Sequence, residues 1–146
     1  MLEKLLGDGG FCMGLASVGS GLGACVAGMA AIGGWKKCYM HNKAAPFILT
    51  AFVGAPLTQT IYGFILGNAI RNANFPDGSG LYQILLGIAY GLGIGISAWM
   101  QGKVGASGAD ALAETGKGFG NYMIVVGILE TVALFILVLA MSALPK

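Results

Sequence analysis

Four long apolar stretches, separated by short polar segments, constrain this chain of 146 residues more than any other feature. Charged residues make up only 10% of the sequence, against about 25% in soluble domains, and they gather between the apolar stretches. Each stretch has roughly 20 to 27 residues, the length that an α-helix needs to cross a bilayer. The sequence therefore predicts membrane-spanning helices over residues 10–34, 45–70, 81–102 and 119–143.

Other membrane architectures fit this pattern poorly. The apolar runs are continuous, whereas the strands of a membrane β-barrel alternate between apolar and polar residues. The first run is also too long for a cleaved signal peptide, and it follows a start of mixed charge. We predict an all-α membrane protein with four transmembrane helices. The net charge of +2 gives no basic surface for nucleic acid, so lipid is the expected environment.

The loops between the predicted helices indicate the orientation in the membrane. Loop 35–44 is basic, whereas the N-terminal stretch is mixed in charge and loop 103–118 is nearly neutral. The positive-inside rule therefore places loops 35–44 and 103–118 on the cytoplasmic side of the cell membrane and both termini on its extracellular side. The residues behind this prediction are Lys36, Lys37, His41 and Lys43 in the first loop, and Glu3, Lys4 and Asp8 before the first helix.

An internal repeat relates the two halves of the chain. Residues 59–66 and 130–137 agree at four of eight positions, and the glycine pattern of the first predicted helix recurs in the third. Such self-similarity predicts one helical hairpin copied once. In this alignment Gln59 and Glu130 are equivalent, so one copy offers a neutral amide where the other offers an acid. The predicted hairpins are residues 1–75 and 76–146.

Glycine is abundant, with 26 residues in the chain, and much of it falls on the first and third predicted helices. Small residues at four-residue spacing let helix backbones approach closely in lipid. Gly19 with Gly23, and Gly87 with Gly91 and Gly95, provide such faces. We expect the first and third helices to form the inner layer of an assembly, with the second and fourth helices outside.

Glu130 lies near the middle of the last predicted helix. An ionised carboxylate at that depth costs at least ~2.5–3.5 kcal/mol, and such residues usually face polar partners or ion pathways. A permanently protonated side chain in an interhelical hydrogen bond is the alternative. Because no lysine or arginine lies within the predicted spans, we favour reversible occupancy of Glu130 by a cation or a proton.

Candidate partners for this carboxylate lie on the second and third helices. Tyr62 follows Thr58 by four residues and Gln59 by three, which turns all three side chains toward one side of a helix. Pro56 just upstream disturbs the backbone because it donates no hydrogen bond. Gln101 adds another amide oxygen. Each residue alone is usually a packing device, but together with a carboxylate these oxygens suit a hard cation.

These residues resemble a known family, the membrane rotor subunit, or proteolipid, of V-type and bacterial A/V-type rotary ATPases. The resemblance covers nearly the whole chain and is most specific at residues 56–64, residues 101–104 and the pair Glu130-Thr131. It implies a homo-oligomeric ring of two-hairpin subunits. In the sodium-translocating type it implies that Na⁺ is bound by Thr58, Gln59, Gln101, Glu130 and the main-chain carbonyl of Ala55, with Tyr62 hydrogen-bonded to the carboxylate.

The same resemblance implies a function and partners. The ring turns against a stator membrane subunit that supplies an arginine, and the cytoplasmic loops contact a central-stalk connector. Glu130 takes up and releases Na⁺, or alternatively H⁺, as the ring rotates, which couples ATP hydrolysis in a soluble head to ion transport. The chain is then a non-catalytic subunit that needs no cofactor.

Three alternatives remain at this stage. A rotor ring specific for protons would use the same carboxylate without the additional oxygens. A small four-helix cation or drug/proton exchanger would also use one membrane carboxylate, although usually in its first helix. A purely structural four-helix protein would not need Thr58, Gln59, Gln101 and Glu130 together. Formation of a ring in detergent would separate the rotor from the exchanger and the structural protein.

Overall fold

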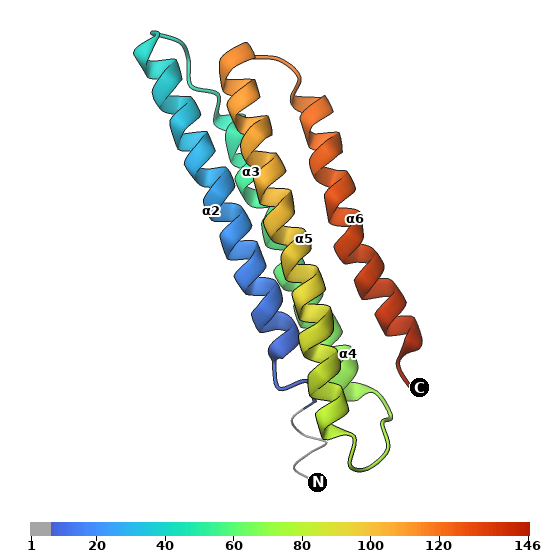
Figure 1. Cartoon of the computed structure of the whole chain (residues 1–146). Helices are drawn as coiled ribbons and strands as arrows, with labels where there is room; N and C mark the ends of the chain where they lie inside the picture. Colours follow the sequence, from blue (N-terminus) through green and yellow to red (C-terminus); the bar gives the residue numbers. More distant parts are fainter. Residues whose placement is uncertain (1–6) are drawn as a thin grey trace.

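A computed structural model describes residues 7–146, and it consists of long helices running side by side (Figure 1). Helix α2 (Phe11–Met40) is followed by a helical segment over Phe47–Asn72, by α5 (Gly80–Thr115) and by α6 (Phe119–Ala143). All four are long and apolar enough to cross a membrane, and residues 7–146 contain no strand. The predicted all-α architecture with four membrane-spanning helices is confirmed.

The second span is helical throughout but changes its winding near its middle. A 3₁₀ turn at Pro56 separates its two α-helical parts, because proline cannot donate the hydrogen bond that a regular α-helix needs there. The predicted disturbance at Pro56 is therefore present. In order, the segment comprises η1 (Phe47–Leu49), α3 (Thr50–Gly54), η2 (Ala55–Leu57) and α4 (Thr58–Asn72).

The predicted loop over residues 103–118 is wrong for most of its length. Helix α5 continues to Thr115, and Gly116 ends it in the left-handed conformation at φ 66°. The Gly116 N–H donates to the carbonyl of Leu112, as expected for a glycine that closes a helix. The polar residues after residue 102 mark the edge of the apolar surface, and they do not end the helix.

The predicted loop over residues 35–44 is wrong in the same way for its first half. Helix α2 extends to Met40, beyond the predicted end at residue 34. Its last turns lie beside the end of α5, where Lys37 forms ion pairs of 2.8 Å with both Asp110 and Glu114. Both helices therefore continue beyond their apolar residues, and ion pairs join their charged ends. The fourth span begins and ends at the predicted residues, 119 and 143.

Helices α2 and α5 are packed so closely that their backbones touch. A Cβ atom built on Gly19 would overlap the backbone of Gly95, and one built on Gly102 would overlap the backbone of Gly23. Only residues without a Cβ permit this approach. The prediction that the glycine faces bring helix backbones together is confirmed within one chain. The predicted inner and outer layers of an assembly remain a prediction.

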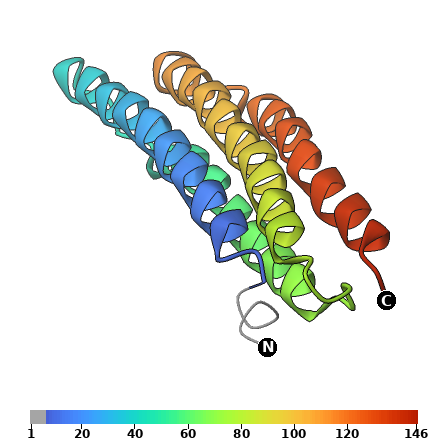
Figure 2. The same cartoon turned by 60° about the horizontal axis from the view of Figure 1, so that its bottom comes forward.

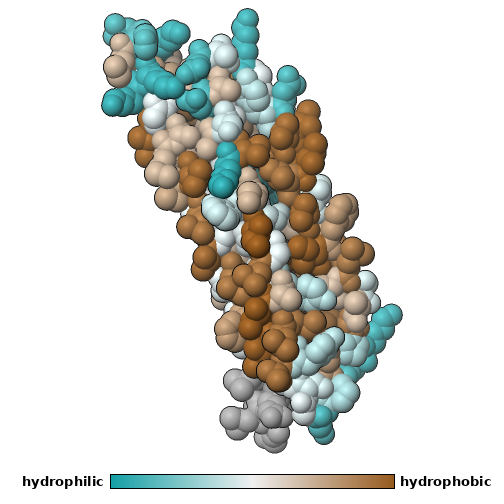
Figure 3. Space-filling model, in the orientation of Figure 1, coloured by the Kyte–Doolittle hydropathy of each residue, from teal (hydrophilic) through white to brown (hydrophobic). Residues whose placement is uncertain are grey.

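The surface of the bundle matches a membrane environment. Polar residues gather at both ends, and apolar residues cover much of the middle of the face shown in Figure 3. Large apolar side chains are exposed on all four spans; examples are Val18, Ile61, Ile96 and Phe135. Such a surface is stable in lipid and unfavourable in water.

The connections lie at two opposite ends of the bundle. Loop 41–46 and the turn 116–118 share the upper end in Figure 1, whereas loop 73–79 and the end of α6 share the lower end (Figures 1 and 2). The first described residues also lie at the lower end, beside α4, because Gly7 contacts Arg71. Glu3 and Lys4, used above to predict the orientation, lie outside the described residues.

Candidate ion-binding site

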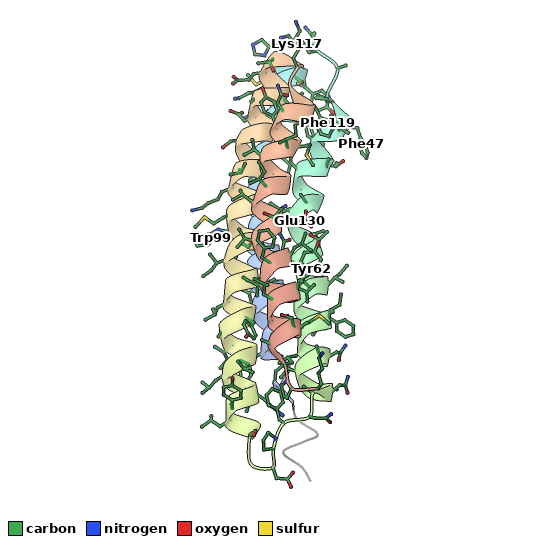
Figure 4. All side chains as sticks on the ribbon, turned by 90° about the vertical axis from the view of Figure 1, so that its right-hand side faces the viewer. Phe47, Tyr62, Trp99, Lys117, Phe119 and Glu130 are labelled. Atoms are coloured by element: carbon green, nitrogen blue, oxygen red, sulfur yellow. The ribbon has the colours of Figure 1, made fainter. Side chains whose placement is uncertain are left out.

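The Glu130 carboxylate receives hydrogen bonds from two other spans. Its Oε1 accepts from the Thr58 hydroxyl at 2.8 Å and from the Tyr62 hydroxyl at 2.7 Å. Its Oε2 lies 3.4 Å from Nε2 of Gln101, a long contact. Figure 4 shows Glu130 and Tyr62 next to each other about halfway along the bundle, with Trp99 directed away from them. The carboxylate thus joins α6 to α4 and α5.

The local structure of the second span explains why Thr58, Gln59 and Tyr62 share one side of it. Helix α4 begins at Thr58, directly after the 3₁₀ turn that contains Pro56. From there, regular α-helical winding turns Thr58, Gln59 and Tyr62 toward the same side. Gln59 is fully buried, while Thr58 and Tyr62 are partly buried.

Three oxygen atoms converge on the hydroxyl of Thr58. Thr58 Oγ1 lies 3.1 Å from the carbonyl oxygen of Ala55, 3.2 Å from Oε1 of Gln59 and 2.8 Å from Oε1 of Glu130. A hydroxyl carries a single proton and can donate it to one acceptor at a time. The cluster is therefore rich in oxygen lone pairs and poor in protons, which is the character of a site for a hard cation.

Two buried glutamines support the back of this cluster. Gln59 Nε2 donates to Oε1 of Gln101 at 2.7 Å, and Gln101 Nε2 donates to the carbonyl of Val126 at 3.1 Å. Both side chains are fully buried. This network directs the Gln59 oxygen toward Thr58 and the Gln101 nitrogen toward α6. As a cation ligand, Gln101 Oε1 would use its second lone pair while still accepting from Gln59.

The charge environment of Glu130 is that of an isolated acid. Among residues 7–146, no lysine or arginine pairs with it, and Lys37, which does form ion pairs, lies at the far end of the bundle. The side chain is partly exposed at the edge of α6, next to the exposed apolar residues Ile128 and Val132. An ionised Glu130 facing lipid would be strongly unfavourable unless a cation or proton neutralised it.

No multi-carboxylate or His/Cys metal cluster exists within residues 7–146. The possible cation ligands at this site are the Glu130 carboxylate, one hydroxyl, two side-chain amides and a main-chain carbonyl. Such neutral oxygens with a single negative charge suit a monovalent hard cation better than a transition metal.

Ser97 belongs to the surroundings of the site and was missed at the sequence level. Its hydroxyl donates to the carbonyl of Leu129 at 2.9 Å, which fixes α5 to α6 directly beside Glu130. Ser97 precedes Gln101 by four residues, so the two share a helix face, and this spacing was the signal available in the sequence. A single serine in an apolar helix is too common to stand out.

The structure brings together all the residues predicted for the site. Thr58, Gln59 and Gln101 lie with Glu130 in one connected hydrogen-bond network, to which Tyr62 and the Ala55 carbonyl also belong. Gln101 lies well inside α5, and not near its end as the shorter predicted helix implied. The role of each residue in ion binding stays a prediction.

A four-helix bundle of apolar helices with a central carboxylate among several oxygen atoms is an arrangement that could carry an ion across a membrane. Comparison with known proteins makes this specific. The family model for the C subunit of ATP synthase matches residues 84–142, which cover most of α5 and nearly all of α6. The K subunit of the A-type ATP synthase of Methanocaldococcus jannaschii is 34% identical over 135 residues, or 92% of this chain.

Both matches cover Gln101 and Glu130, and the match to the K subunit also extends over the first half of the chain. The chain is therefore similar to the C and K subunits of ATP synthases. It spans 59% of the length of the curated relative that it matches.

Proposed function

We propose that this chain is an ion-carrying subunit of the rotor ring of a V/A-type rotary ATPase. The observation that carries the proposal is the Glu130 carboxylate, at mid-depth in an apolar bundle, bonded by Thr58 and Tyr62 and lacking a basic partner among the described residues. The similarity to C and K subunits of ATP synthases supports the assignment. The chain is not catalytic alone, because ATP hydrolysis takes place elsewhere in such a complex.

The electrostatics of Glu130 supply the coupling step. With its ion bound, the side chain is neutral and can move past lipid; without its ion, the bare charge must stay near an arginine of the stator subunit. Rotation of a homo-oligomeric ring past that arginine then requires ion release and uptake at each step. ATP hydrolysis and ion transport are thereby coupled, and the exchanger alternative is disfavoured by the family match.

We propose Na⁺ as the transported ion. The support is the convergence of oxygens on Thr58 Oγ1 from Ala55, Gln59 and Glu130, all within 3.2 Å. A dehydrated sodium ion needs several oxygens, whereas a proton needs the carboxylate and one partner. Binding of Na⁺ would also compete with protonation of Glu130, since a metal requires the deprotonated ligand.

A proton-specific ring is the second candidate. The observation in its favour is the Gln101 amide, which directs its nitrogen and not its oxygen toward Glu130 Oε2. In that arrangement Gln101 stabilises the carboxylate itself and contributes one ligand fewer to a cation.

The membrane orientation follows from the distribution of charge on the described ends. The end that carries loop 41–46 and the turn 116–118 holds most of the lysines, and the positive-inside rule makes it cytoplasmic. The projecting ends of α2 and α5 would then contact the central-stalk connector, and both chain ends would face outward.

The test is the substitution Glu130→Gln in the reconstituted ATPase. We expect a ring of unchanged mass, because the amide keeps the size of the side chain and its oxygen can still accept from Thr58 and Tyr62. We also expect loss of ion transport and of coupled ATP hydrolysis, because an amide cannot alternate between a charged and a neutralised state. Retained transport would remove Glu130 from the mechanism, and a monomer in several mild detergents would contradict the ring.

A further inference from the structure

Ser20 carries a fully buried hydroxyl that has no hydrogen-bond partner among residues 7–146. It lies on α2 with 1% of its surface exposed, and its Oγ contacts neither a donor nor an acceptor. A serine in an apolar helix normally bonds to the carbonyl four residues before it, as Ser17 does with Met13 at 2.7 Å. An unsatisfied buried hydroxyl is costly, so Ser20 calls for an explanation.

The packing of α2 against α4 places Ser20 opposite Gln59. Ala16 of α2 lies against Gly63, and Gly23 lies against Pro56. The two helices run in opposite directions, so Ser20, between Ala16 and Gly23, faces the stretch between Pro56 and Gly63. Gln59 is the buried polar residue of that stretch.

Gln59 itself has an unused hydrogen-bond donor. The amide nitrogen carries two protons, of which one is donated to Gln101 Oε1 at 2.7 Å. No acceptor for the second proton occurs among the described residues. Gln59 and Ser20 therefore leave a donor and an acceptor unused at the same depth of the bundle.

We propose that Ser20 is a positioning residue for the ion site, which accepts the second Nε2 proton of Gln59 when a cation is bound. A cation on Gln59 Oε1 polarises the amide and makes its N–H groups stronger donors. The bond to Ser20 then holds Oε1 toward Thr58 and the ion. This inference rests on the proposed sodium-binding function.

The experiment compares Ser20→Ala with Ser17→Ala in the purified ring. A carbodiimide labels Glu130, and the Na⁺ concentration that gives half-protection is measured. We expect Ser20→Ala to raise that concentration about two- to tenfold, the effect of one hydrogen bond. Ser17→Ala removes a hydroxyl that bonds within its own helix, so half-protection should not change.

A second readout separates positioning from a structural role. In Na⁺-free buffer, Ser20→Ala should label with the same pH dependence as the wild type and should not lower the thermal stability of the ring. A purely structural hydroxyl would lower stability without a selective change in Na⁺ protection. Normal Na⁺ protection in Ser20→Ala would overturn this inference alone. Absence of Na⁺ protection in the wild type would overturn the sodium site and this inference together.

Discussion

Two of the helix interfaces of this bundle are built in different ways. Between α2 and α5 the contact is made by backbone atoms at Gly19, Gly95 and their neighbours. Between α4 and α6 it is made by side chains that meet at Glu130. A backbone contact permits no rearrangement without separating the helices, whereas hydroxyl and carboxylate groups can change partners by rotating.

This difference suggests that the two interfaces have different roles. The α2–α5 pair is a rigid support, and the α4–α6 side carries the groups that we propose bind and release an ion. Helix α6 is nevertheless fixed at one end, where the rings of Phe52 and Phe119 pack edge to face with centroids 5.7 Å apart. The site therefore has a stable frame and an adaptable centre.

The largest expected effect comes from breaking the rigid interface. Gly19→Ala places a Cβ within the backbone of Gly95, so the helices must move apart. We expect a loss of about 1–3 kcal/mol in stability, the usual cost of overpacking, visible as a lower melting temperature of the ring in detergent. Gly21→Ala is the matched control, because its Cβ meets nothing within 4 Å. Equal stability of the two variants would contradict the rigid-support account.

A smaller effect should come from changing the adaptable side. Thr58→Val keeps the shape of the side chain but removes the oxygen on which three others converge. We expect at least a tenfold rise, or about 1.4 kcal/mol, in the Na⁺ concentration that half-protects Glu130, with assembly intact. Thr60→Val is the control on the same helix and should leave protection unchanged, because the Thr60 side chain forms no hydrogen bond within residues 7–146. A ring of Thr58→Val that fails to assemble would mean that the hydroxyl is structural.

The smallest effect should come from the charged extensions of α2 and α5. Lys37→Ala removes both of its ion pairs, with Asp110 and Glu114, all three side chains being about half exposed. Exposed ion pairs contribute little to stability because water and salt screen them. We expect no shift in melting temperature beyond experimental error at physiological salt. A large shift would show that the extensions stabilise the bundle as much as the glycine interface does.

Much of the fold could be predicted because the lipid environment restricts each span to mostly apolar residues. Each span needs a continuous apolar run, so residues 119–143 were identified with both ends correct. The ends of α2 and α5 could not be found in the same way. Hydropathy reports where the bilayer ends, whereas the helix continues until a residue such as Gly116 closes it.

The site residues that could be predicted are those that lie close together in the sequence or that are unusual in a membrane span. Thr58, Gln59 and Tyr62 follow helical spacing, and an acid at mid-span draws attention by its cost. Gln101 was included as an additional amide oxygen, but its direct link to Gln59 depends on how α4 packs against α5, which spacing within one helix cannot show. Ser20 gave no signal because its importance lies in a register between two helices.

The most direct test of the central claim is labelling of wild-type Glu130 by a hydrophobic carbodiimide that reacts with protonated carboxyl groups. The account predicts labelling at mildly acidic pH, and protection by millimolar Na⁺ but not by K⁺ at equal ionic strength, because Na⁺ would bind the deprotonated carboxylate among the oxygens of Thr58 and Gln59. Labelling that ignores Na⁺ across that pH range would contradict the sodium site and identify Glu130 as a proton carrier.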